Sequence, residues 1–152
     1  MSAAPQDLSP QALAESCAAS MWALDRASQG LGMSLDRVAP GEASVSMTVT
    51  EAMCNGLATC HGGFIFTLAD SAFAFACNGY NQHTVAQHAS ITFIAAAFAG
   101  DRLTARAREV SRKGRGGIYD ISVVNQAGEM VAEFRGHSRT VKGTHLPAPP
   151  AD

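Results

Sequence analysis

The chain has 152 residues, of which 47% are hydrophobic and 16% are charged, and its formal net charge is -2 at pH 7. This length predicts one domain around one core, and the near-neutral charge excludes a whole-molecule field that would recruit nucleic acid or an anionic membrane. The four cysteines show no C-x-x-C pair and no dense spacing, and the N-terminus lacks a signal-peptide pattern, so a cytoplasmic location is expected.

The first predicted element is an amphipathic helix that begins near residue 9. Ser9 followed by Pro10 is typical of a helix N-cap with proline at the first helical position. Apolar residues then recur at helical spacing over about four turns, namely Leu13, Cys17, Met21 and Leu24. Residues 1–8 are expected to form a disordered N-terminus, residues 9–145 the single domain and residues 146–152 a flexible tail.

Two strands are expected next. Residues 31–38 are an irregular strand candidate, whereas between residues 43 and 50 apolar side chains alternate regularly with Ser and Thr. The second pattern predicts a half-buried strand.

The longest apolar stretch runs from Gly62 to Cys77 and carries one ionisable carboxylate, Asp70. It is shorter than the roughly 20 residues that a membrane-spanning helix needs. We therefore interpret it as a core helix of a folded domain.

Strand-like alternation fills the second half of the chain. It covers residues 89–93, 103–108, 118–124 and 130–141, and a turn-like sequence over 125–128 joins the last two segments. Short links between successive strands predict an antiparallel meander. A helix that is apolar nearly all round must be covered on nearly all sides, so we expect an α+β hot-dog fold, a curved sheet wrapped around the helix. The exposed edges of such a sheet favour pairing of two copies.

Asp70 is the leading candidate for a catalytic group. Burial of an unpaired carboxylate is costly, and proteins usually avoid it by pairing the group, raising its pKa or opening it to a cavity. The alternative is an aspartate that turns to solvent or bonds to nearby backbone.

His61-Gly62-Gly63 immediately precedes the apolar helix. Glycines at a helix start let backbone N–H groups approach a ligand, so this turn could bind a developing oxyanion, although a plain tight turn is equally compatible. Asn55-Gly56 is first of all a turn, and the Asn55 amide could also polarise a carbonyl or hold a water.

A Cys60–His61 nucleophile pair and a metal site from Cys54, Cys60 and His61 are both disfavoured by the spacing, so no metal is expected.

A basic, glycine-rich link joins two of the predicted strands. It contains Arg112, Lys113 and Arg115, and it lacks the strand-to-helix context and the ending of a P-loop. These side chains could meet the phosphates of a ligand, or they could form a solvated loop.

The segment from Asn55 to Asn78, N-G-L-A-T-C-H-G-G-F-I-F-T-L-A-D-S-A-F-A-F-A-C-N, resembles the signature of the phenylacetic acid degradation (PaaI-type) branch of hot-dog acyl-CoA thioesterases. A looser likeness extends from about residue 31 to residue 141. The chain departs from the family at Ala95-Ala96, where members often have Arg-Pro.

The resemblance implies hydrolysis of aryl-acyl-CoA thioesters such as ring-hydroxylated phenylacetyl-CoA. It implies Asp70 as the catalytic carboxylate, the Gly62 N–H as the group that polarises the thioester carbonyl, Asn55 as a helper and His61 in support. Gly63, Arg112, Lys113 and Arg115 are then candidates for substrate binding. The family uses no metal or redox cofactor, and its dimers often pair into homotetramers.

Three other functions stay open at this point. One is an acyl-CoA-binding regulator or sensor on the same fold, another is a hot-dog dehydratase, and the third is a thioesterase for medium-chain fatty acyl-CoA.

Overall fold

The computed structural model describes residues 4–147. Its N-terminal part contains the 3-10 helix η1 (Pro5–Asp7), helices α1 (Pro10–Trp22) and α2 (Arg26–Gly30), strands β1 (Ser34–Ala39) and β2 (Glu42–Thr48), and the 3-10 helix η2 (Glu51–Met53). Helix α3 (Gly62–Cys77) follows, and then strands β3 (Thr84–Phe93), β4 (Arg102–Lys113), β5 (Gly116–Val124) and β6 (Met130–Thr140).

The predicted chain ends are only partly covered by this description. Residues 1–3 of the expected disordered N-terminus and residues 148–152 of the expected flexible tail lie outside the described residues. Residues 5–7, also expected to be disordered, form a short 3-10 helix. The predicted first helix is confirmed, because the Ser9 hydroxyl accepts a hydrogen bond from the Ala12 N–H and Pro10 is the first helical residue.

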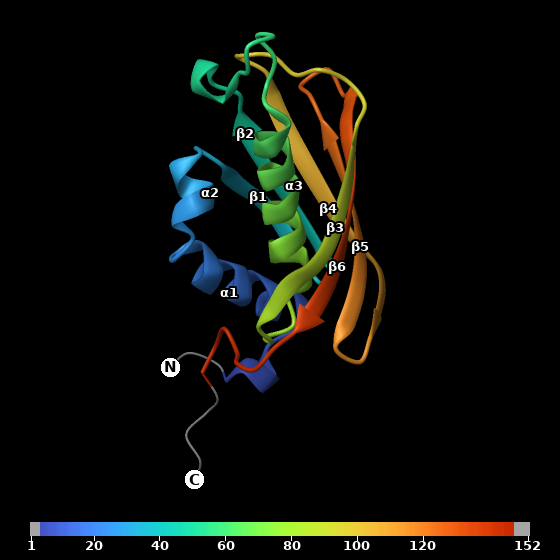
Figure 1. Ribbon diagram of the computed structural model, residues 1–152. Helices are drawn as coiled ribbons and strands as arrows, with labels where there is room; N and C mark the ends of the chain where they lie inside the picture. The colour runs from blue at the N-terminus through green and yellow to red at the C-terminus, as the bar shows by residue number, and fades with distance from the viewer. Residues whose placement is uncertain (1–3, 148–152) are drawn as a thin grey trace.

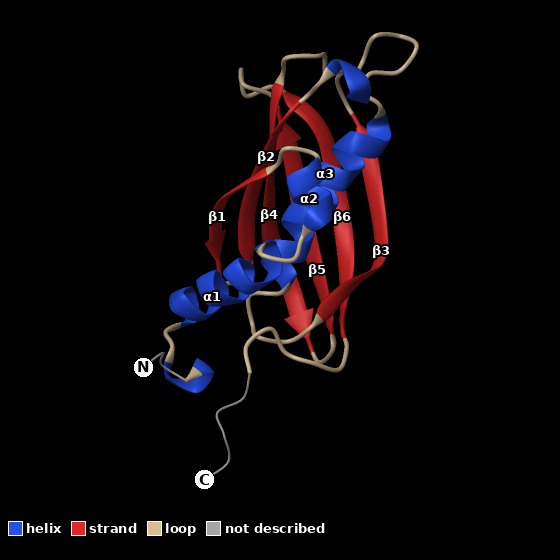
Figure 2. Cartoon of the chain, turned by 90° about the vertical axis from the view of Figure 1, so that its left-hand side faces the viewer, coloured by secondary structure: helices blue, strands red, loops and turns tan. Residues whose placement is uncertain are grey.

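The six strands form one antiparallel sheet in the order β1-β2-β4-β5-β6-β3. Helix α3 runs along one face of this curved sheet, and α1 and α2 lie on the same side (Figures 1 and 2). The α+β hot-dog arrangement predicted from the sequence is thereby confirmed.

The predicted meander is correct for β4, β5 and β6 and wrong for β3. Strand β3 pairs with β6 along its whole length, from Thr84 opposite Thr140 to Phe93 opposite Ala132, and it does not pair with β4. The connection over residues 94–101 is long enough to carry the chain from the edge strand β3 past β6 and β5 to β4. Strand β3 is therefore an outer edge, where seven of its ten residues are exposed.

One side of α3 is buried against the sheet, and another side is not. The sheet-facing residues include Leu68, Ala72 and Phe73, each at most 1% exposed. Phe73 fits because β6 has a glycine opposite it: a Cβ on Gly136 would lie 2.8 Å from the Phe73 ring. A second stripe at helical spacing is only partly covered, namely Gly63, Phe66, Thr67, Asp70 and Ala74.

Candidate active site

A short loop with a closed base leads into α3. Cys54 and Cys60 face each other in an antiparallel bridge, and the Asn55 N–H donates to the Thr59 carbonyl at 2.8 Å. The Asn55 side-chain oxygen also accepts from the Leu57 N–H at 2.9 Å and from the Thr59 hydroxyl at 3.2 Å. Asn55 thus shapes its own turn with its oxygen, while its amide NH₂ stays available as a donor on an exposed residue.

His61 is the N-cap of α3. Its Nδ1 accepts a hydrogen bond from the Gly63 N–H at 2.9 Å, which satisfies one of the unpaired donors of the first turn. The Gly62 N–H has no acceptor within residues 4–147. It therefore remains at the positive end of the helix dipole, where a developing oxyanion is stabilised.

The ring of Phe93, the last residue of β3, packs onto Gly62. A Cβ on Gly62 would lie 2.8 Å from the Phe93 Cζ, which is closer than real Cβ contacts. The glycine thus lets this ring, which is 52% exposed, lie directly on the turn. Sequence reasoning missed Phe93, because only the position of β3 at the sheet edge brings this ring to the start of α3.

Asp70 lies two turns further along α3, on its partly covered stripe. Burial raises the pKa of its carboxyl above the usual range, and no donor within the described residues is in hydrogen-bond reach of that carboxylate. Both features are typical of catalytic acids and bases. Next to it, the Ser71 hydroxyl meets the Ser28 hydroxyl at 2.9 Å, and Ser28 donates to Asp25 at 2.6 Å. These contacts hold α2 on the turn of α3 that carries Asp70.

One chain does not bring the two central groups together. Gly62 and Asp70 are separated by eight residues of one helix, and the helical rise places their backbones about 12 Å apart. Near-attack contacts need roughly 3 Å. The carboxylate and the Gly62 N–H of the same chain are therefore poorly placed to meet one carbonyl group.

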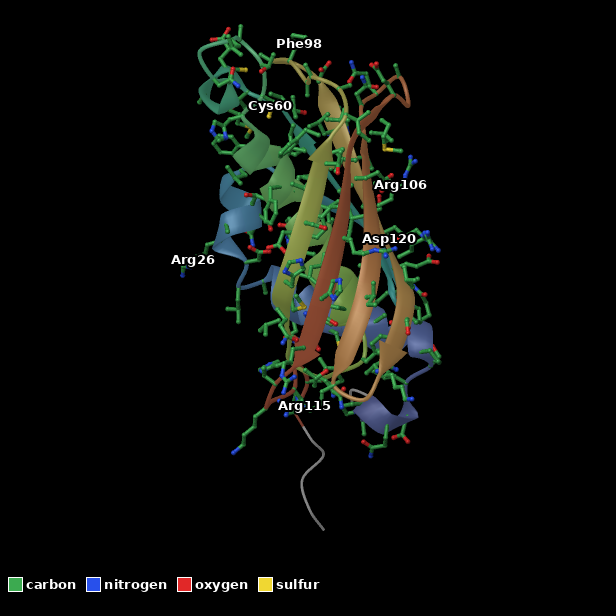
Figure 3. The ribbon with its side chains drawn as sticks, turned by 45° about the vertical axis from the view of Figure 1, so that its right-hand side comes forward. Arg26, Cys60, Phe98, Arg106, Arg115 and Asp120 are labelled. Atoms are coloured by element: carbon green, nitrogen blue, oxygen red, sulfur yellow. The ribbon has the colours of Figure 1, made fainter. Side chains whose placement is uncertain are left out.

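The basic hairpin between β4 and β5 lies at the opposite end of the molecule from the His61-Gly62-Gly63 turn. Figure 3 shows Arg115 at one end of the molecule and Cys60, beside His61, at the other. Arg115 donates to the Thr140 carbonyl at 3.0 Å, and the Arg112 guanidinium stacks 3.7 Å from the centre of the Tyr80 ring. Within one chain, the hairpin that carries Arg112, Lys113 and Arg115 thus lies away from the His61-Gly62-Gly63 turn.

Within residues 4–147, no group of three His, Cys, Asp or Glu side chains is arranged to hold a metal ion. None of the helices in this range is long and apolar enough to cross a membrane.

Comparisons with known proteins identify the family of this chain. A family model described as the thioesterase superfamily matches residues 57–132, which include the His61-Gly62-Gly63 turn and Asp70. The chain is 44% identical over 124 residues to an Escherichia coli protein named acyl-coenzyme A thioesterase PaaI, which covers 82% of this chain and 89% of that protein.

Solved structures show the same likeness. The structure of the E. coli PaaI protein from the phenylacetic acid degradation operon superposes with a TM-score of 0.88 at 43% identity, covering 90% of this chain and 99% of that one. A variant of the phenylacetic acid degradation protein PaaI from Thermus thermophilus superposes with a TM-score of 0.74 at 37% identity, covering 77% of this chain and all of that one.

Proposed function

The chain belongs to the thioesterase superfamily, and from that premise we propose that it is an acyl-CoA thioesterase that hydrolyses aryl-acyl-CoA thioesters, with (hydroxy)phenylacetyl-CoA as the substrate class. The observation that carries this proposal is the unpaired, half-buried carboxylate of Asp70 on α3, in a chain that is 44% identical to a protein named acyl-CoA thioesterase. The products are the free acid and CoA.

Asp70 is the catalytic residue of this proposal, by one of two routes. As a general base it takes a proton from water, the hydroxide adds to the thioester carbonyl, and the CoA thiolate leaves and is protonated. As a nucleophile it adds to the carbonyl itself and gives a mixed anhydride that water then hydrolyses. A single turnover in oxygen-18 water separates the routes, because nucleophilic attack places an enzyme-derived oxygen in the first product.

The other groups act on the carbonyl. The Gly62 N–H donates to the oxygen that becomes negative, at the start of α3, where backbone donors and the helix dipole point outward. His61 keeps this turn in place through its bond to the Gly63 N–H. The Asn55 NH₂ holds the carbonyl or the water, since its oxygen is already used within the loop.

Each site is built from two chains. The partly covered stripe of α3 and the exposed edge of β3 carry large apolar side chains with incomplete cover: Phe66 is partly buried against Phe134, and Phe93 is 52% exposed. If two copies pair with their α3 helices antiparallel, Gly62 of one copy lies opposite Asp70 of the other. The dimer has two equivalent sites, and two dimers form the homotetramer.

Substrate binding involves Gly63 at the turn and the basic hairpin. In the assembly Lys113 and the remaining Nη1 of Arg115 face the CoA phosphates, since Arg115 Nε and Nη2 already donate to the Thr140 carbonyl and Arg112 stacks on Tyr80. Neither a metal nor a redox cofactor takes part, and the location is the cytoplasm.

Release of free CoA thiol from a panel of aryl-acyl and fatty acyl-CoA esters tests the function. We expect the highest kcat/KM with phenylacetyl-CoA or its hydroxylated forms, and a loss of roughly 10²–10⁴-fold in kcat for Asp70→Asn with a small change in KM. Asp36→Asn, which removes a carboxylate on the edge strand β1, is the matched control and should retain turnover.

The same panel decides between the alternatives. Binding of CoA esters without thiol release would indicate a regulator, and preference for medium-chain esters would move the substrate class to fatty acyl-CoA. Near wild-type turnover in Asp70→Asn would exclude Asp70 as the catalytic group.

A further inference from the structure

Two cysteines face each other at the base of the loop that carries Asn55. Cys54 and Cys60 are partners in an antiparallel bridge, and the backbone bonds flank them: Asn55 donates to Thr59, and His61 donates to Met53, both at 2.8 Å. A pair between two such flanking bonds is a non-hydrogen-bonded pair. In these pairs the Cα atoms are about 4.5 Å apart and both side chains project to the same side of the ladder.

This geometry lies within reach of a disulfide. Disulfides require Cα atoms about 4.4–6.8 Å apart and Cβ atoms about 3.5–4.5 Å apart. The Cα spacing of a non-hydrogen-bonded pair is inside this range, and its Cβ spacing of about 4.5–5.5 Å must shorten by up to about 1 Å. Of the four free cysteines, only Cys54 and Cys60 share a bridge within residues 4–147.

The two thiols differ in access. Cys54 is partly exposed, so a soluble oxidant can reach it, whereas Cys60 is 5% exposed and packs in the core. Burial, with a smaller effect of Cys54, raises the pKa of Cys60 to about 11. Cys54 is therefore the thiol that reacts first, and Cys60 is placed to react second with the sulfur of Cys54.

We propose that Cys54 and Cys60 form a reversible disulfide under oxidation, and that this bond switches the loop of Asn55 and His61 between an active and a less active geometry. Hydrogen peroxide oxidises the Cys54 thiol to a sulfenic acid and releases one water. The Cys60 sulfur then attacks the sulfur of Cys54, the S–S bond forms, and a second water leaves with the sulfenic oxygen. A dithiol reductant reverses the bond by thiol–disulfide exchange.

The effect on turnover follows from the neighbours of the two cysteines, and this part rests on the proposed function. Asn55 directly follows Cys54, and His61, the N-cap of α3, directly follows Cys60. Figure 3 shows Cys60 near the same end of the molecule as Phe98. Cys60 precedes the first residue of α3, Gly62, by two positions. A displacement of about 1 Å at catalytic groups can cost about 10²-fold in rate. We expect oxidation to lower kcat by at least about tenfold.

Differential thiol labelling of the full chain tests bond formation without any assay of activity. The native protein is treated with hydrogen peroxide, denatured with one alkylating reagent, reduced, and labelled with a second reagent before mass spectrometry. We expect Cys54 and Cys60 to carry the second label in equal amounts. Before any labelling, the intact mass of the oxidised protein should be lower than that of the reduced protein by two hydrogens. Cys17 and Cys77 should carry the first label and serve as internal controls.

Two results would overturn the bond. One is first-label modification of both Cys54 and Cys60 after a treatment that fully oxidises dithiothreitol in a parallel tube. The other is accumulation of sulfinic acid on Cys54 while Cys60 stays a free thiol. Cys54→Ser removes the reacting thiol at an accessible position, and its Cys60 should carry only the first label.

Turnover measured on the same samples tests the switch. The oxidised wild type should lose activity and recover it with dithiothreitol, whereas Cys54→Ser should not respond to either reagent. An unchanged kcat in the disulfide form would refute the switch. If no form hydrolyses any CoA ester, the proposed function fails while the labelling result still stands.

Discussion

The position of Asp70 on α3 lowers the stability of the fold when its carboxyl is charged, because the group is partly buried. Burial raises the pKa of its carboxyl above that of the unfolded chain, which is about 3.9. The folded protein therefore binds more protons than the unfolded one between the two pKa values, and the free energy of unfolding decreases as the pH rises through that interval. Above the folded-state pKa the cost of the charged, buried group is fully present.

We predict that Asp70→Asn raises the Tm at pH 7 while it lowers kcat. An amide has the size of the carboxyl and stays neutral, so the variant loses the cost of burying a charge. Thermal unfolding at pH 7 and at about pH 3, below both pKa values, checks this. The gain should be present at pH 7 and absent at the lower pH. A Tm at pH 7 below that of the wild type would show that the charged carboxylate is stabilised by a partner.

A second prediction concerns Gly62. Gly62→Ala places a Cβ against the Phe93 ring, and because this ring is 52% exposed and can turn away, we expect a loss of about 1 kcal/mol in the free energy of unfolding. Displacement of the turn should also lower kcat. Chemical denaturation and the thiol-release assay measure both effects.

Gly56→Ala is the matched control, because no atom lies within 4 Å of a Cβ at this position of the same loop. Its change should stay within about 0.5 kcal/mol. Phe93→Leu in combination with Gly62→Ala should restore stability. If it does not, the Phe93 ring is not what requires a glycine.

The candidate residues differ in how readily sequence alone predicts them. Asp70 and the His61-Gly62-Gly63 turn are conspicuous, since a lone carboxylate in an apolar helix and paired glycines at its start are local patterns. The contact of Phe93 with Gly62 and that of Ser71 with Ser28 join segments distant in sequence. Periodicity carries no information about such contacts.

Among the elements, helix α3 and the turn between β5 and β6 are encoded locally, whereas α2 (Arg26–Gly30), the full lengths of β3 and β4, and the order of the strands are not. Helix α3 begins at Gly62 and ends at Cys77, as its apolar run predicts, and the turn at 125–128 joins β5 to β6. Strand β3 differs, because alternation identifies a buried face without identifying a neighbour. The long connection over 94–101 allows β3 to reach β6.

The hairpin between β4 and β5 gives a prediction that separates its three basic residues. The Arg112 guanidinium lies over the Tyr80 ring and 3.8 Å from the Glu109 carboxylate, which also accepts from Tyr80 and Tyr119 at 2.8 Å. Arg112→Ala should therefore lower the free energy of unfolding by about 1 kcal/mol.

Lys113→Ala and Arg115→Ala should instead raise KM for CoA esters, by up to about fivefold each. Lys113→Ala should change stability little, whereas Arg115→Ala also removes two hydrogen bonds to the Thr140 carbonyl and should lower the free energy of unfolding by about 1 kcal/mol. The thioester of pantetheine, which lacks the nucleotide phosphates, should show no such increase. Equal effects on the CoA and the pantetheine esters would remove these two residues from the phosphate site.

The whole molecule leaves its central helix incompletely covered. The sheet covers one side of α3, and α1 and α2 lie on the same side of the sheet as α3 (Figure 2). The stripe with Phe66 and Asp70 is only partly buried, and seven of the ten residues of β3 are exposed. Apolar side chains at an unpaired sheet edge favour association with another copy. The expectation that the helix is covered on nearly all sides is met only with the second chain that we propose, and composition alone cannot tell which side that chain covers.

The final prediction tests the shared site by complementation. Because the backbones of Gly62 and Asp70 are about 12 Å apart in one chain, we propose that each site takes Gly62 from one chain and Asp70 from the other. A dimer of one Asp70→Ala chain and one Gly62→Ala chain then has one intact site and one doubly defective site. Co-expression with two different tags allows the heterodimer to be purified. It should show about half of the wild-type turnover, whereas the Asp70→Ala homodimer is inactive and the Gly62→Ala homodimer has a lowered kcat. Analytical ultracentrifugation of each parent confirms that the variants still associate. A heterodimer with no more turnover than the mean of its two parents would place Gly62 and Asp70 of one site in the same chain, and the proposed antiparallel pairing of the α3 helices would then be wrong.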